Sequence, residues 1–235
     1  MTYKCFDVEI ADKIARITLK RAAEFNSMTP DFWRELPEIV RDIDDGAKAR
    51  VIVIASTGKH FTAGMDLSVF TSGQSAGAAA AVSTEERGRV RANLRRAILE
   101  LQETFNVLDR ARMPVLAAVQ GGCIGAGVDM ISACDCRYAT EDTFFVIQEI
   151  NLGMTADVGT FPRLCHLMGQ SALRELAYAG RRLPAQKAKE LGLVSEVFAA
   201  HRQPLPRGRR DGGCRRRRIG NRLVRIMGGF GGWRR

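Results

Sequence analysis

Two short, uninterrupted apolar runs, each followed at once by a glycine-containing segment, constrain the fold of this chain more than any other feature. Residues 51–55 read Val-Ile-Val-Ile-Ala, and residues 115–119 read Val-Leu-Ala-Ala-Val. Such runs are typical of strands that are buried on both faces, as in parallel sheets covered by helices. The sequence therefore predicts an α/β fold in which strands alternate with helices and the sheets are layered.

The patterns around these runs predict the other elements. Polar and apolar residues alternate in an N-terminal β-hairpin, and apolar residues at helical spacing follow Thr29-Pro30 as far as Asp45-Gly46. Pro37 counts against this helix, because proline has no backbone N–H to donate. The expected elements are the hairpin at 5–10 and 14–19, helices at 30–45, 83–107, from about 126, 158–168, 171–179 and 184–191, and further strands at 143–147 and 194–198.

Charge is distributed unevenly along the chain of 235 residues, which has 36 basic residues, 26 acidic residues and a net charge of +10. Residues 202–235 contain twelve Arg, eight Gly and one acidic residue, whereas the first 201 residues are almost neutral. We therefore expect residues 1–200 to form the folded domain. Residues 201–235 are interpreted as a tail that is disordered or comes from a shifted reading frame, because its composition offers no apolar face.

Several classes of protein are excluded by the cysteines, the histidines and the apolar runs. The six cysteines show no spacing of a disulfide or zinc framework, so reduced and mostly buried thiols are expected. The three histidines show no metal or triad partners, and no metal is expected. No apolar run approaches the roughly 20 residues of a membrane helix. No targeting signal is visible, and the sequence indicates an intracellular protein that is not bound to a membrane.

The segments after the two apolar runs carry the candidate chemistry. Residues 61–67 read Phe-Thr-Ala-Gly-Met-Asp-Leu, and residues 121–129 read Gly-Gly-Cys-Ile-Gly-Ala-Gly-Val-Asp. Glycine lets a backbone approach a ligand closely, and amides at a helix N-terminus have no partner within the helix. One amide from each segment would hold a carbonyl oxygen and stabilise an enolate. Taken separately, a segment of either kind is more often a turn or a close packing contact, and the second lacks the spacing of a dinucleotide-binding motif.

Together, in order and spacing, the two segments resemble the oxyanion-hole segments of the crotonase (enoyl-CoA hydratase/isomerase) superfamily. The resemblance implies a crotonase-like β-β-α spiral core of layered sheets with surrounding helices, and residues 1–200 as its catalytic domain. It implies that the superfamily's two acid/base positions fall on Asp129 and Glu149. The oxyanion donors would be the N–H groups of Met65 and Ala126, and the implied substrate-binding residues are Ala63, Gly64, Met65, Asp66, Leu67 and Ala126. Asp66 is equally compatible with a cap on a helix that begins near residue 67.

A third carboxylate, Asp157, narrows the resemblance. It stands eight residues after Glu149, as in the dienoyl-CoA isomerase branch of the superfamily, which residues 31–35 and 102–107 also resemble. The implied activity moves the double bonds of a 3,5-dienoyl-CoA to positions 2 and 4 in fatty-acid β-oxidation. Glu149 would take the proton from C2, Asp157 would deliver one to C6, and Asp129 would tune Glu149 within the pocket.

Other functions stay open at this point. An enoyl-CoA hydratase on the same fold is the nearest alternative, although the superfamily's hydratases have glutamate in place of Asp129 and usually an apolar residue in place of Asp157. An RNA-binding crotonase-fold protein that uses the basic tail is a second alternative, and an inactive oligomer subunit is a third. Against RNA binding, the tail has few aromatic residues and no repeated Arg-Gly-Gly motif.

The resemblance also implies the partners and the compartment. An acyl-CoA would be the substrate, with coenzyme A as part of it and no separate cofactor. The assembly would be a homotrimer or a dimer of trimers, and the compartment mitochondrial, peroxisomal or glycosomal. The superfamily continues with helices that cover the CoA site and support the trimer, whereas helix-forming sequence stops here near residue 200. The tail is therefore the main departure from the superfamily.

Overall fold

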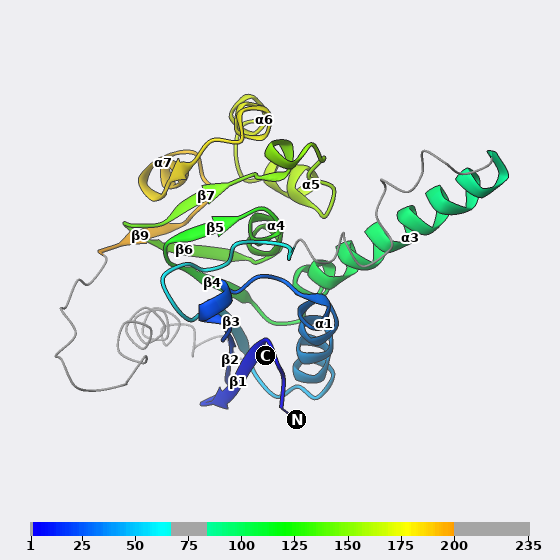
Figure 1. The fold of residues 1–235 in the computed structure, drawn as a ribbon. Helices are drawn as coiled ribbons and strands as arrows, with labels where there is room; N and C mark the ends of the chain where they lie inside the picture. The colour runs from blue at the N-terminus through cyan, green and yellow to red at the C-terminus, as the bar shows by residue number, and fades with distance from the viewer. Residues whose placement is uncertain (1, 67–83, 200–235) are drawn as a thin grey trace.

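A computed structural model describes residues 2–66 and 84–199 of the chain, which form two β-sheets with surrounding helices (Figure 1). The larger sheet has the strand order β1-β2-β3-β4-β6-β9, and the smaller has the order β5-β7-β8. The strands are β1 (Phe6–Ala11), β2 (Ile14–Leu19), β3 (Val51–Ser56), β4 (Val115–Val119), β5 (Gly122–Ile124), β6 (Cys136–Thr140), β7 (Phe144–Val146), β8 (Leu183–Pro184) and β9 (Glu196–Phe198). The helices are α1 (Pro30–Asp45), α3 (Thr84–Asp109), α4 (Ala126–Ser132), α5 (Thr160–Leu164), α6 (Gln170–Ala179) and α7 (Ala185–Glu190), with the 3-10 turns η1 (Ala22–Glu24) and η3 (Glu149–Leu152).

The expected hairpin is present and turns at Asp12 and Lys13, whose φ angles are 51° and 63°. Two consecutive positive φ angles are typical of a two-residue hairpin turn, since they match the twist of the flanking strands. β1 and β2 pair antiparallel from Phe6 opposite Leu19 to Ala11 opposite Ile14. The remaining pairs of the large sheet, from β2–β3 onward, are parallel, as the buried apolar runs predict.

Pro37 does not end or divide α1. The helix runs from Pro30 to Asp45, and its apolar face is buried. A residue at position 37 would normally donate its N–H to the carbonyl of Trp33, which proline cannot do. In the structure the hydroxyl of Thr104, on α3, donates to this carbonyl at 3.2 Å. The tertiary contact therefore satisfies the carbonyl that Pro37 leaves unpaired.

The strand β6 is the longest of three strands that the sequence does not predict, the others being β5 and β8. It contains Arg137, a charged residue that interrupts the apolar pattern although its side chain is buried. The guanidinium donates to the backbone carbonyls of Leu193 (2.7 Å), Ile131 (3.4 Å) and Cys134. Because backbone carbonyls satisfy the charge, β6 lies between β4 and β9 inside the sheet.

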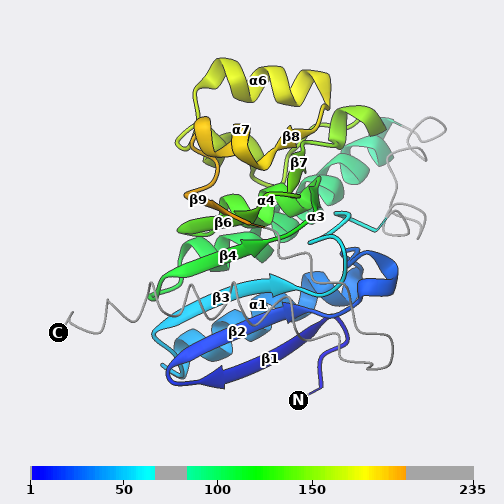
Figure 2. The ribbon, with the colours of Figure 1, turned by 90° about the vertical axis from the view of Figure 1, so that its left-hand side faces the viewer.

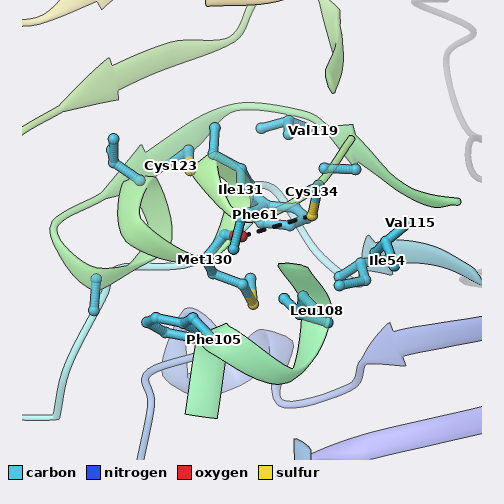
Figure 3. Close-up of a cluster of buried hydrophobic side chains, with 14 of the residues drawn as sticks. Ile54, Phe61, Phe105, Leu108, Val115, Val119, Cys123, Met130, Ile131 and Cys134 are labelled. Atoms are coloured by element: carbon cyan, nitrogen blue, oxygen red, sulfur yellow. Dashed lines mark hydrogen bonds between the residues drawn. The ribbon is translucent and has the colours of Figure 1, made fainter. Parts of the chain in front are cut away.

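The layers are arranged around one main core. Figures 1 and 2 show α1 against one face of the large sheet, and α6 and α7 beyond the small sheet on the side away from α1. The close-up shows side chains from β3, α3, β4 and α4 meeting in this core, including Ile54, Phe105, Val115 and Met130 (Figure 3). The first turns of α4, which carry part of the candidate site, are therefore held by buried packing.

Three expectations about particular side chains can be compared with the structure. Trp33 packs against Phe32 and Phe105 and donates its indole N–H to the carbonyl of Met28, which confirms a packing role. The five cysteines that the structure describes are free, and three of them are buried, as expected; they are Cys5, Cys123, Cys134, Cys136 and Cys165. Residues 201–235, Cys214 among them, lie outside the described residues, and so does the interpretation of the tail.

Candidate active site

The two glycine segments lie side by side because they follow parallel neighbouring strands. β3 and β4 pair in parallel, so their carboxyl ends lie at the same edge of the sheet. Beyond that edge the N–H of Phe61 donates to the carbonyl of Gly122 at 2.9 Å, and the N–H of Ile124 donates to the carbonyl of Thr62 at 3.2 Å. The two segments that the resemblance assigns to one site are therefore in direct backbone contact.

Gly64 permits this contact, and no other residue type fits its position. Its φ angle is 88°, a conformation that L-residues with a Cβ rarely adopt. A Cβ atom there would lie 2.7 Å from the carbonyl oxygen of Ile124 and 3.5 Å from the amide nitrogen of Ala126. The first segment therefore reaches the second at the first residue of α4.

The Met65 and Ala126 amides are available as hydrogen-bond donors. Met28 pairs with the residues on both sides of Met65, since its N–H donates to Gly64 at 2.8 Å and its carbonyl accepts from Asp66 at 3.2 Å. Ala126 is the first residue of α4, where an amide has no partner in the helix. Neither amide donates a hydrogen bond to any residue within 2–66 or 84–199. Among the described residues, nothing therefore competes with a ligand oxygen for either amide.

Asp129 is a fully buried carboxylate on the first turn of α4. The hydroxyl of Thr160, at the start of α5, donates to its Oδ1 at 2.6 Å, while Oδ2 is buried and has no partner among the described residues. The pKa of Asp129 is raised from 3.8 to about 7: burial is the main cause, the Thr160 hydrogen bond opposes the shift, and the charge of Glu149 adds to it. Asp129 is thus held near the point of half protonation at neutral pH.

Glu149 opens the turn η3, directly beside the second glycine segment. Its Oε1 lies 3.4 Å from the position that a Cβ atom on Gly125 would occupy. Its Oε2 is buried and has no hydrogen-bond partner in the described part of the chain. Burial raises the pKa of Glu149, and the charge of Asp157 contributes to the increase. A desolvated carboxylate of this kind is a stronger base than one in water.

Asp157 lies in the loop between η3 and α5, and its residue is exposed at the surface. The side-chain amide of Gln102, on α3, donates to the backbone carbonyl of Asp157 at 2.6 Å and fixes this part of the loop. Partial desolvation of the carboxylate raises the pKa of Asp157. Two of the three predicted carboxylates thus respond to the charge of another: Glu149 raises the pKa of Asp129, and Asp157 raises the pKa of Glu149.

The other residues predicted to bind substrate lie in the first glycine segment, on either side of Gly64 and Met65. Ala63 is exposed and donates its N–H to the carbonyl of Phe25 at 2.9 Å. The carboxylate of Asp66 accepts a hydrogen bond from the Ser27 hydroxyl at 2.9 Å. Leu67 lies outside the described residues, and so does the helix that Asp66 was expected to cap. His60, to which the sequence assigns no partner, accepts a hydrogen bond in the second glycine segment.

A cavity of about 540 Å³ lies near this site but is not lined by Asp129, Glu149 or Asp157. It opens at the C-terminal end of α4, where Cys134 and Arg137 line it together with Gly159 and Arg163.

Within residues 2–66 and 84–199, no group of three or more acidic, His or Cys side chains could hold a metal ion. In the same ranges, no helix is long and apolar enough to cross a membrane.

A comparison of the sequence with models of protein families shows the family of this chain. The sequence model of the enoyl-CoA hydratase/isomerase family matches residues 9–204. The chain belongs to the enoyl-CoA hydratase/isomerase family. Solved structures of the family confirm the crotonase fold that the glycine segments predict. A putative enoyl-CoA hydratase from Thermobifida fusca in complex with CoA is 26% identical, with a TM-score of 0.77 over 96% of this chain and 78% of that one.

Relatives of this chain in sequence are named for one particular reaction within the family. The peroxisomal Δ(3,5)-Δ(2,4)-dienoyl-CoA isomerase of Arabidopsis thaliana is 38% identical over 187 residues, which cover 80% of this chain and 66% of that protein. The mitochondrial enzyme of the same name from Homo sapiens is 42% identical over 201 residues, covering 84% of this chain and 59% of that protein. The chain thus spans less than two thirds of the length of these two relatives.

Proposed function

We propose that this chain is a Δ3,5-Δ2,4-dienoyl-CoA isomerase, which converts a 3,5-dienoyl-CoA to the 2,4-dienoyl-CoA. The observation that carries the proposal is the placement of Asp129 and Glu149, with Asp157 acting on Glu149, beside two backbone amides that have no acceptor among the described residues. The relatives named above support the choice of substrate. A shift of two double bonds removes a proton at one carbon and delivers one four carbons away. That distance favours two separate carboxyl groups over a single one.

The first step is proton removal from C2. The carboxylate of Glu149 takes the proton, and the electron pair of the C–H bond delocalises into the thioester as an extended enolate. The N–H groups of Met65 and Ala126 donate to the enolate oxygen, and such donors typically contribute about 10²–10³-fold each to the rate. The absence of a competing acceptor for either amide within residues 2–66 and 84–199 supports this role.

The second step is proton delivery to C6. The carboxylic acid of Asp157 gives its proton to C6, and the electron pairs shift so that the double bonds stand at positions 2 and 4. Desolvation raises the pKa of Asp157, which is the direction that a proton donor requires. The proton on Glu149 then returns to Asp157 directly or through solvent. The charge of Glu149 raises the pKa of the buried Asp129, and Asp129 thereby holds its proton beside the ionised base.

Diene conjugation provides the test of this proposal. The purified chain is supplied with a 3,5-dienoyl-CoA, and absorbance of the conjugated 2,4-dienoyl thioester is followed with time. Growth of this absorbance supports the isomerase. Water addition to a 2-enoyl-CoA without any diene shift would identify a hydratase instead. A chain that does neither, although folded by circular dichroism, would be a subunit without this activity.

The assembly and the compartment belong to the same proposal. Figure 1 shows the N-terminal half of α3 projecting from the body, and this half exposes Val90 and Leu94, with Leu99 exposed in the next turn. Exposed apolar side chains on a projecting helix support contact with a second copy. We propose a homotrimer or a dimer of trimers, which sedimentation would measure. The names of the relatives support a mitochondrial or peroxisomal location.

A further inference from the structure

His60 directly precedes the first glycine segment in the chain, and its side chain contacts the second. Its carbonyl accepts hydrogen bonds from the Asn26 amide at 3.3 Å and from the Ser56 hydroxyl at 3.4 Å. Its ring nitrogen Nδ1 accepts the N–H of Gly122, in the second segment, at 2.9 Å. The ring packs against Phe144, with the centroids 6.1 Å apart.

The hydrogen bond with Gly122 requires the neutral ring. A backbone N–H only donates, so Nδ1 has to present a lone pair, and the ring proton then resides on Nε2. In protonated histidine both nitrogens carry protons, and two donors would face each other at Nδ1. Protonation of His60 therefore breaks this contact and turns it into a repulsion.

The backbone around Gly122 has little room to adapt. A Cβ atom on Gly121 would lie 2.1 Å from the carbonyl oxygen of Lys59, and a Cβ atom on Gly122 would lie 3.2 Å from Nδ1 of His60. The carbonyl of Gly122 also accepts the amides of Phe61 and Thr62. A shift of Gly122 would therefore displace the first segment through these two hydrogen bonds. It would also displace Ala126 through the intervening residues 123–125.

We propose that His60 is a positioning residue: its neutral ring fixes the second glycine segment against the first and so sets the geometry of the Met65 and Ala126 amides. This inference rests on the proposed function, because it assigns those amides to the oxyanion. His60 does not touch the reacting atoms. Its effect is on the position of the two donors, to which catalysis is sensitive, since a displacement of about 1 Å costs up to about 10²-fold in rate.

The surrounding charges favour the neutral ring. Burial lowers the pKa of His60, the charge of Lys59 lowers it further, Asp142 opposes the shift, and Arg182 contributes a smaller decrease. The guanidinium of Arg182 lies over the Phe144 ring at 4.4 Å, on the side chain that packs against His60. The contact with Gly122 is therefore intact at neutral pH and is lost when the pH falls below the pKa of His60.

Two substitutions separate positioning from packing. In His60→Asn the side-chain oxygen replaces Nδ1 as the acceptor and does not titrate, whereas in His60→Leu the volume stays but the acceptor is lost. We expect His60→Leu to lower kcat by about 10- to 100-fold with a smaller change in KM. His60→Asn should retain most of kcat and lose the part of the acidic decline that follows the pKa of His60. His166→Asn, at an exposed histidine, is the control.

Amide NMR tests the contact independently of activity. In the wild-type chain the Gly122 amide resonance should shift with the pKa of the His60 ring, and in His60→Asn this titration should disappear. If the chain isomerises no diene but this titration is present, the proposed function fails while the contact stands. A Gly122 resonance that does not follow His60, or a His60→Leu variant with wild-type kcat, would overturn the positioning role. Equal impairment of the Asn and Leu variants would overturn it as well.

Discussion

The Thr160 hydroxyl donates to Oδ1 of Asp129 at 2.6 Å, yet this single donor leaves the other oxygen of a fully buried carboxylate without a partner among the described residues. Burial without full pairing opposes the charged form, which is why the pKa of Asp129 rises to about 7. The unpaired oxygen costs stability, and the same burial gives the site a carboxyl group beside Glu149 that holds its proton up to about pH 7.

The first prediction concerns the stability of the folded chain as a function of pH. Between pH 4 and pH 7 the unfolded chain has lost the proton of Asp129 and the folded chain still holds it, so stability falls as the pH rises through this window. The full penalty, present above pH 7, is on the order of 4 kcal/mol for a shift of about three pKa units. Asp129→Asn removes the charge and keeps an oxygen that accepts from Thr160.

The variant should therefore match the wild type near pH 4 and be more stable by several kcal/mol at pH 8, as measured by urea unfolding. Asp45→Asn, at an exposed residue near the end of α1, is the control and should change little at either pH. A stability difference between Asp129→Asn and the wild type that is the same at both pH values would contradict the assignment of a raised pKa.

The second prediction concerns the roles of the two outer carboxylates. Glu149→Gln and Asp157→Asn should each lower turnover by about 10²–10⁴-fold, the scale for loss of a general base or acid. Substrate affinity should change little, because neither group is assigned to binding CoA. Exchange of the C2 proton with solvent deuterium should persist in Asp157→Asn and vanish in Glu149→Gln. The opposite pattern of exchange would reverse the two roles.

The third prediction tests the close approach of the two glycine segments. Gly64→Ala places a methyl group 2.7 Å from the carbonyl oxygen of Ile124 at a φ angle of 88°. Gly153→Ala is a matched control, because Gly153 also has a positive φ angle, 69°, but a Cβ atom there would meet nothing within 4 Å. Both variants should lose about 1 kcal/mol from backbone strain.

Only Gly64→Ala should lose further stability and activity, since only this variant separates the segments. The melting temperature and kcat of both variants measure the difference. If Gly153→Ala were as inactive as Gly64→Ala, conformational strain by itself would explain the effect and the contact with Ile124 would be unimportant.

The fourth prediction concerns a buried carboxylate that supports the fold. Glu35, on α1, accepts the backbone N–H of Lys4 at 2.8 Å and that of Cys5 at 2.9 Å, and so fixes the chain just before β1. Glu35→Gln replaces one acceptor by a donor, which should destabilise the fold by about 2–3 kcal/mol. The same change at Glu38, an exposed residue of α1, should cost less than about 0.5 kcal/mol. Equal unfolding free energies for the two variants would contradict this role.

The sequence by itself determined those strands and segments whose conformation depends on residues close together in the chain. The apolar runs in β3 and β4 exclude water on both faces, and alternation in β1 and β2 requires a half-buried hairpin, so these elements could be predicted without the fold. The two glycine segments were sufficient to indicate the superfamily, since their residue types follow from a close backbone approach that few other residues permit.

Only the tertiary structure decided the contacts between distant segments. β6 could not be predicted, because Arg137 is compatible with a buried strand only when carbonyls from elsewhere in the fold accept its charge. The contact of His60 with Gly122 joins residues 62 positions apart, and nothing local indicates it. The pKa of Asp129 likewise depends on burial and on Thr160, so its value is a property of the packed site and not of the residue. Local patterns specify elements, whereas packing brings charges and donors into the low-dielectric surroundings in which they act.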